Sequence, residues 1–259
     1  YLLLINPEDK KSLKIRSANL QLIETDVPWF GVKEQTKLLS LINEIKPDLV
    51  HFTNFNFPVA YKGKFVITIH DLTLLHFRNL RSSVFSKAYY LLKESIMKNV
   101  VLKRGIARAC SIIVPTEYVK EDVSKTFKVR RNKIEVTYEA VEQDFSSPAV
   151  NLQNMGITKK FVLYVGNAYP HKNLERMIIA FGKLVTEYVL DYQLVIAGKK
   201  DSFHQTLETA VKDAGLNDRV VFTGYVTDRE LAGLYKNASL YVFPSLSEEE
   251  KRRFHQVNA

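Results

Sequence analysis

The sequence predicts an α/β protein built from two doubly wound, parallel-sheet domains. Short apolar runs rich in β-branched residues recur along the chain, helical stretches separate them, and the alternation pauses only once. Continuous apolar runs such as 65–69 indicate strands covered on both faces, as in a parallel sheet. Strands that alternate with helices form right-handed βαβ units. The 259 residues can form one large domain or two modest ones.

The first half of the chain carries one series of these elements. We expect strands at 1–6, 19–24, 48–52, 65–70, 111–115 and 133–138, with helices at 32–45, 82–108 and 117–127. The first run opens the chain in mid-strand. We therefore expect a domain over residues 1–150 that lacks its first strand.

The second half repeats the pattern after a polar, turn-rich connection at 145–158. We expect strands at 161–165, 193–197, 220–222 and 240–243, with helices at 174–188, 202–214 and 228–236. The connection predicts a domain boundary, so the second domain spans residues 151–259.

The net charge of +9 is concentrated in residues 78–108, a stretch that contains eight basic residues and a single acidic residue, Glu94. The same stretch is apolar on one side, and three interpretations stay open: a helix packed on a sheet with a solvated basic face, a segment on an anionic membrane surface, or a nucleic-acid contact. No RNA- or DNA-binding motif supports the last. No apolar run approaches the ~18–20 residues that a membrane span needs.

The single cysteine, Cys110, excludes an intramolecular disulfide and suits a reducing cytoplasm. Its apolar neighbours predict a small buried residue that leads into a strand. The spacing of His51, His70 and His76 does not match a zinc pattern, so we expect no metal site.

Ligands of open parallel sheets bind beyond the carboxyl ends of the strands. The strand at 161–165 is followed by Gly166 and Asn167, and Lys172 lies at the next helix start. A glycine allows close approach, and a helix N-terminus with a lysine favours an anion such as a diphosphate. The alternative is a strand–helix turn with a solvated lysine.

A second strand end carries His70 and Asp71. The histidine is either a packed residue bonded to Asp71, or a residue that contacts a sugar hydroxyl or moves a proton while Asp71 fixes its ring.

The ordered motifs of the second half resemble the donor domain of retaining glycosyltransferases of the group one, or family four, class. They are Val-Gly-Asn (165–167), Lys-Asn-Leu (172–174), Leu-Val-Ile-Ala-Gly (194–198), Val-Phe-Thr-Gly-Tyr-Val (221–226) and Phe-Pro-Ser-Leu-Ser-Glu (243–248). In the first half, Pro-Asp-Leu-Val-His-Phe (47–52) and Val-Ile-Thr-Ile-His-Asp-Leu (66–72) resemble the bacterial mannosyltransferase-like branch that builds surface polysaccharides. The resemblance implies the GT-B fold, two Rossmann-like domains that face a cleft.

The resemblance also implies the roles of individual residues. Lys172 would bind the donor diphosphate; many members have an Arg where this chain has Asn167. His70, Asp71 and Glu248 would lie near the transferred sugar, with Glu248 as the first glutamate of an E-x₇-E motif. The remaining donor-binding residues would be Gly166, Gly198, Gly224, Tyr225, Val226 and Ser247.

The function that follows from the resemblance is transfer of a hexose from a nucleotide-diphosphate sugar to a glycan or lipid-linked acceptor, with retention at the anomeric carbon. Mannose from GDP-mannose, or a UDP-sugar, is the expected donor, and no cofactor, metal or nucleic acid is expected. The protein would be cytoplasmic and peripheral at the inner membrane face through residues 78–108.

The pattern departs from the family after Glu248. The family has a Gly-Phe-Gly-Leu-Pro-like stretch and a second glutamate there, whereas this chain has a charged tail. We therefore expect an incomplete donor domain, whether from a shortened chain, a disrupted reading frame or an inactive relative. A non-catalytic nucleotide-sugar or glycan-binding protein and a GT-B epimerase are the alternatives. A phosphorylase would need a pyridoxal-binding lysine motif, which this sequence does not contain.

Overall fold

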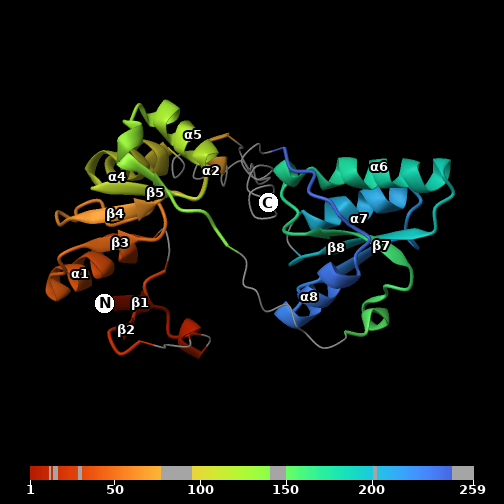
Figure 1. Ribbon diagram of the computed structural model, residues 1–259, viewed down its shortest axis with the longest axis horizontal. Helices are drawn as coiled ribbons and strands as arrows, with labels where there is room; N and C mark the ends of the chain where they lie inside the picture. The colour runs from red at the N-terminus through yellow and green to blue at the C-terminus, as the bar shows by residue number, and fades with distance from the viewer. Residues whose placement is uncertain are drawn as a thin grey trace. The chain divides into compact units, whose positions relative to one another are not determined.

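The computed structural model describes residues 1–11, 13, 17–28, 31–76, 95–140, 150–200 and 203–246. It divides into two compact units, the first formed by Tyr1–Leu75 and Leu80–Thr137 and the second by His76–Asn79 and Tyr138–Ala259. Each unit contains a parallel sheet with helices against it (Figure 1). The predicted α/β class with parallel sheets is therefore confirmed.

The first unit contains a four-stranded parallel sheet in chain order and a separate parallel pair. The sheet consists of β3 (Val50–Phe52), β4 (Phe65–Thr68), β5 (Ser111–Val114) and β6 (Ile134–Val136), and the pair of β1 (Leu2–Ile5) and β2 (Gln21–Glu24). Every strand expected in this half of the sequence is present, because each apolar run is bounded by residues that favour turns.

The described helices of this unit are α1 (Leu39–Ile45), α2 (Thr73–His76), α4 (Lys103–Arg108) and α5 (Glu117–Phe127). They are accompanied by π-helical turns at Glu34–Leu38 and Met97–Leu102 and by 3-10 turns at Asp9–Lys11 and Arg131–Lys133. Helix α5 has the predicted bounds, because the Thr116 side chain accepts a hydrogen bond from the Val119 amide and Lys128 ends the helix in a left-handed conformation. Residues 82–94 of the helix expected at 82–108 lie outside the described residues, and residues 95–108 are helical.

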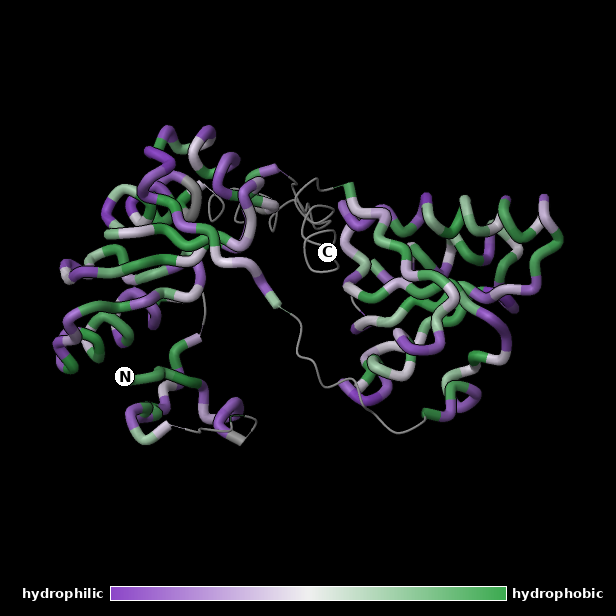
Figure 2. Tube along the Cα trace, viewed as in Figure 1, coloured by the Kyte–Doolittle hydropathy of each residue, from purple (hydrophilic) through white to green (hydrophobic). Residues whose placement is uncertain are grey.

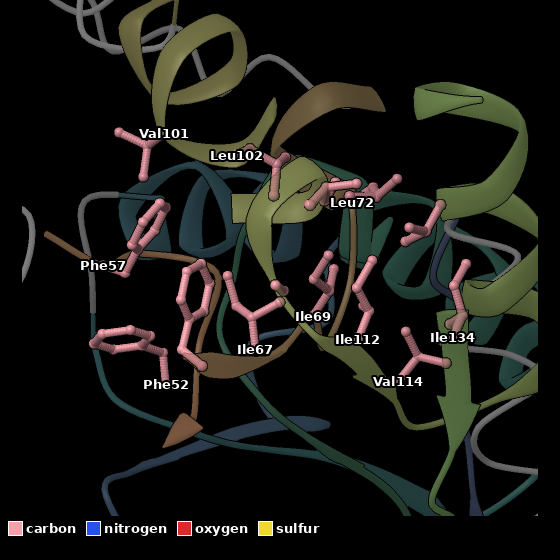
Figure 3. Close-up of a cluster of buried hydrophobic side chains, with 14 of the residues drawn as sticks. Phe52, Phe57, Ile67, Ile69, Leu72, Val101, Leu102, Ile112, Val114 and Ile134 are labelled. Atoms are coloured by element: carbon pink, nitrogen blue, oxygen red, sulfur yellow. The ribbon is translucent and has the colours of Figure 1, made fainter. Parts of the chain in front are cut away.

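The core of the first unit lies between its sheet and its helices (Figure 3). Ile67, Ile112 and Ile134 come from three neighbouring strands and lie in register across the sheet. Leu102 and Ile106 from the basic stretch are buried against them. The face of the sheet that carries these three isoleucines is therefore covered by the helical segment that contains Leu102 and Ile106.

The basic stretch thus packs on the sheet where it is described. Lys103, Arg104 and Arg108 are exposed, whereas Val101 and Ile106 are buried. Among residues 99–108 the helical packing on the sheet is confirmed, and the exposed basic face is open to solvent or to an anionic surface.

The prediction for Cys110 is wrong, because its side chain is exposed. Its amide donates to the Phe65 carbonyl at 2.8 Å, and β5 begins at the next residue. The preceding Ala109 is buried instead. Cys110 lies between α4 and the first residue of β5, so the alternation that buries Ile112 and Val114 does not extend to it.

The second unit contains a four-stranded parallel sheet with the order β10-β7-β8-β9. Its strands are β7 (Lys160–Val165), β8 (Tyr192–Ala197), β9 (Val220–Gly224) and β10 (Leu240–Tyr241). The chain winds outward from β7 to β9 and then returns to pair β10 with the other edge of β7. This reversal is a topological switch point, and it lies between β7 and β10.

Helices cover both faces of this sheet: α6 (Leu174–Glu187) and α7 (His204–Asp213) lie on one side and α8 (Asp228–Asn237) on the other (Figure 1). Two 3-10 turns occur at Leu152–Met155 and Pro170–Lys172. Leu194 and Ile196 pack with α6 and α7, whereas Val195 packs with α8. This two-sided burial explains the continuous apolar strand, while α6 alternates hydrophobic and hydrophilic residues (Figure 2).

None of the helices in the described ranges combines the length and hydropathy that crossing a membrane requires.

Candidate functional site

The switch point of the second unit identifies the region where a ligand is expected. In open parallel sheets the crevice lies outside the carboxyl ends of the two strands at which the winding reverses. Here these are β7, followed by the predicted donor residues Gly166, Asn167 and Lys172, and β10, followed by residues 242–246. We call residues 242–246 the exit segment of β10.

The ends of β7 and β8 approach so closely that residue 198 must be a glycine. A Cβ atom on Gly198 would lie 2.0 Å from the carbonyl oxygen of Gly166. The hydrogen-bonded ladder continues past the strands, since the Gly166 amide donates to Ala197 at 2.9 Å and the Gly198 amide to Gly224 at 3.0 Å. The predicted glycines thus form a backbone surface at the edge of the sheet.

A buried tyrosine shapes the first turn of this surface. The Tyr164 side chain is fully buried, and its hydroxyl donates to the Asn167 carbonyl at 2.9 Å. Gly166 has a φ of 149°, and a Cβ atom there would lie 2.7 Å from the same hydroxyl. The tyrosine therefore fixes the path of the chain around Asn167 and requires glycine at residue 166.

Lys172 lies at the end of a short turn that leads into α6. The 3-10 turn Pro170–Lys172 is followed by Asn173 in a left-handed conformation with a φ of 61°, and α6 begins at the next residue. The helix start expected next to Lys172 is therefore present. The first-turn amides of a helix lack partners within the helix, so the lysine and the helix start together favour an anion.

The exit segment of β10 is bonded to this turn. The Leu246 amide donates to the His171 carbonyl at 2.8 Å, and the Ser245 hydroxyl donates to the same oxygen at 3.3 Å. The Asn173 side-chain amide donates to the Pro244 carbonyl at 3.2 Å. These three bonds join the two sides of the switch point.

The end of β9 adds an exposed aromatic ring to the same edge. Gly224 has a φ of 73°, which favours glycine, and Tyr225 after it is 78% exposed. Val226 packs against the core on the α8 side of the sheet. Ser247 and Glu248 lie outside the described residues, so their roles stay predictions.

The first unit has its own polar strand ends. His70 follows β4, and its Nε2 lies 3.0 Å from the Thr53 carbonyl oxygen, so this nitrogen donates to the loop after β3. The Asp71 carboxylate accepts from the Thr73 amide at 2.9 Å and thereby caps the start of α2. The His70 side chain is exposed, so the interpretation of this histidine as a packed residue is wrong. Its contact with a sugar hydroxyl, or a role in moving a proton, stays a prediction.

His51 lies on β3, and its Nε2 is 2.8 Å from the Thr68 hydroxyl of the neighbouring strand. Burial lowers the pKa of His51, which favours its neutral form. Within the residues that the structure describes, no three His, Cys, Asp or Glu side chains come together as metal ligands.

Sequence reasoning gave no role to Tyr164, Asn173 or Phe243, although all three shape the switch point. Asn and aromatic residues at such positions carry no signal for long-range contacts. Phe243 belongs to the motif at 243–248 that was used to predict a role for Glu248. In the folded unit its ring lies near the Lys172 ammonium, a contact that the sequence does not reveal.

The comparisons with known proteins match both halves of the chain. The model of "Glycosyl transferases group 1" matches residues 152–250, and the model of "Glycosyltransferase Family 4" matches residues 12–145, more than half of the chain. The chain belongs to glycosyltransferase family 4. The suspected family is therefore confirmed.

Relatives of this family-4 chain include the O-antigen chain mannosyltransferase RfbU of Salmonella typhimurium, which is 26% identical over 85% of this chain and 56% of the relative. Among solved structures, sucrose-phosphate synthase from Thermosynechococcus elongatus has a TM-score of 0.65 at 18% identity, over 94% of this chain and 64% of that one. Anabaena HepE, in complex with UDP and glucose, has a TM-score of 0.61 at 15% identity, over 88% and 61%.

These structures confirm the GT-B fold for the family-4 chain. The chain spans little more than half the length of the curated relative.

Proposed function

We propose that this family-4 chain carries the nucleotide-sugar site of a hexosyltransferase, which transfers its sugar with retention to a glycan or lipid-linked acceptor. The observation that carries the proposal is the position of Lys172, in the turn after β7, at the switch point where such sheets bind ligands. We base the proposed donor class and the preference for mannose on the similarity to an O-antigen chain mannosyltransferase, so GDP-mannose is the first donor to test. A UDP-sugar is the second, because HepE was solved with UDP and glucose.

The chemistry assigned to this edge is stabilisation of a departing diphosphate. As the glycosidic bond to the donor breaks, negative charge grows on the diphosphate oxygens. The Lys172 ammonium and the start of α6 would offset that charge without a metal ion. The glycine backbone at residues 166 and 198 would let the ligand approach the peptide groups closely.

The catalytic roles are proposals of the same kind. His70 and Asp71 of the first unit would act near the transferred sugar, and Glu248 would hold it. Asn167 can donate a hydrogen bond but carries no charge, so Lys172 is the main counter-charge among the donor residues proposed here.

Titration of GDP and UDP into wild type and the Lys172→Ala variant tests the proposal, with turnover of GDP-mannose and UDP-glucose measured in parallel. Because a charge-assisted hydrogen bond contributes about 1.5–3 kcal/mol, we expect Kd to rise about 10- to 100-fold. Lys183→Ala, which removes an exposed lysine of α6, the helix that follows Lys172, is the matched control and should bind as wild type does.

Three outcomes separate the candidates. Binding and transfer that both depend on Lys172 support the hexosyltransferase. Lysine-dependent binding without transfer identifies a nucleotide-sugar-binding protein instead. Equal binding by the Lys172→Ala and Lys183→Ala variants sinks the assignment of the diphosphate.

We also propose that the basic stretch 78–108 rests on an anionic membrane surface, which would place the protein at the cytoplasmic face. Lys103 and Arg104 are exposed, and so are two apolar residues, Val100 about one turn earlier and Ile96 about two turns earlier. Replacing Lys103 and Arg104 with glutamate should abolish co-flotation with phosphatidylserine-containing vesicles; equal flotation would contradict the proposal.

A further inference from the structure

The side chain of Lys172 has an aromatic partner across the switch point. Its Nζ lies 5.4 Å from the centroid of the Phe243 ring. That distance is within the ~6 Å at which an ammonium is attracted by the negative face of an aromatic ring. Phe243 belongs to the exit segment of β10.

The backbone around Lys172 is held by the same segment. His171, on one side of the lysine, accepts hydrogen bonds from Ser245 and Leu246. Asn173, on the other side, donates to Pro244. The exit segment therefore fixes both the peptide groups that flank the lysine and the end of its side chain.

An aromatic ring is a suitable resting partner for a lysine that binds a diphosphate. A free lysine side chain populates many rotamers, and binding a ligand restricts them. A contact that holds the ammonium near the ligand beforehand lowers that cost. A carboxylate would hold it too, but it would compete with the phosphate as a rival anion, whereas a ring carries no charge.

We infer that Phe243 is a positioning residue for Lys172: its ring holds the lysine ammonium at the switch point, so that the donor diphosphate meets a pre-oriented charge. The inference rests on the proposed function, because it takes Lys172 as the diphosphate ligand. Phe243 itself contacts no donor atom in this role. Its effect on binding must therefore pass through the lysine.

A double-mutant cycle tests that dependence, with GDP and UDP as the titrated probes. We expect Phe243→Leu to raise Kd about three- to tenfold, in line with a partly exposed cation–π contact. The same substitution in the Lys172→Ala background should have no further effect. Phe243→Tyr keeps a ring and should bind as wild type does.

Two controls separate positioning from packing. Phe222 and Phe243 pack at the edge of the same core cluster, but Phe222 contacts His204 rather than a lysine. Phe222→Leu should therefore leave Kd unchanged. If Phe243→Leu does not fold, Phe243→Met replaces the ring by a flexible side chain of similar volume and should show the same loss of affinity.

The spectroscopic readout is the ring-current shift on the ε-methylene protons of Lys172. We expect an upfield shift in wild type and the Tyr variant and its loss in the Leu variant. Additive effects in the cycle, or equal losses in Phe222→Leu and Phe243→Leu, would overturn the inference while leaving the proposed function intact. If wild type binds neither nucleotide, the proposed function fails first, and the inference fails with it.

Discussion

Residue 198 lies where the ends of β7 and β8 touch, and a methyl group there has nowhere to go. In Gly198→Ala the new Cβ would lie 2.0 Å from the Gly166 carbonyl oxygen, whereas real Cβ contacts essentially never fall below 3.0 Å. The two strand ends must therefore separate by about 1 Å. The obstacle is backbone, so no side-chain rotation can relieve the clash.

The cost follows from what the separation disturbs. Overpacking that forces backbone shifts costs about 1–3 kcal/mol, and the two hydrogen bonds that flank the contact, Gly166 to Ala197 and Gly198 to Gly224, contribute about 1 kcal/mol each. We expect a loss of about 3 kcal/mol in the free energy of unfolding of the second unit. For a unit of this size that corresponds to a fall in Tm of about 10 °C.

The assay is urea unfolding followed by far-UV circular dichroism, with amide hydrogen exchange read out on β7 and β8. Exchange is needed because a chain of two units does not unfold as one two-state system. Gly182→Ala on α6 is the matched control: its Cβ would meet only the flexible end of Leu216, at 3.0 Å. Helix propensity favours that alanine, so we expect a change within about 1 kcal/mol. Equal stability of the two variants would refute the reasoning.

Two further predictions concern other buried contacts. Tyr164→Phe removes the hydrogen bond to the Asn167 carbonyl, and we expect the unit to lose about 1 kcal/mol by urea unfolding; an unchanged midpoint would show that water replaces the hydroxyl. The lowered pKa of His51 means that the unfolded chain takes up this proton more readily, so stability falls as the pH drops through about 6.5. In the His51→Asn variant, the difference in unfolding free energy between pH 8 and pH 5 should be smaller than in wild type. An unchanged difference would show that His51 is not the origin of this pH dependence.

The elements of the fold could be predicted from the sequence because their signals are local. Burial on both faces of the sheet makes β8 a continuous apolar run, and the caps at Thr116 and Lys128 give α5 its predicted bounds. The π-helical entry at Glu34–Leu38 carries no such signal, since it depends on packing against neighbouring segments. Cys110 was misplaced because apolar neighbours do not reveal which way a strand entrance turns.

The candidate site was predictable only in part. The positions of Gly166, Gly198 and Gly224 follow from strand ends, and the resemblance supplied their roles. The partners of Lys172 were not predictable, because Phe243 lies 71 residues further along the chain and reaches it only after β10 has paired with β7. Ser247 and Glu248 lie beyond the described residues.

The bonds between the exit segment and residues 171–173 also have a consequence for the order of folding. Strands β7, β8 and β9 and their helices can assemble from neighbouring parts of the chain, but the Leu246–His171 bond closes a loop of about 75 residues. During synthesis the turn around Lys172 leaves the ribosome long before its anchors do. The turn should therefore be among the last parts of this unit to become ordered. A chain that stopped at residue 240 would fold most of the sheet, but the turn around Lys172 would lack the hydrogen bonds that hold it.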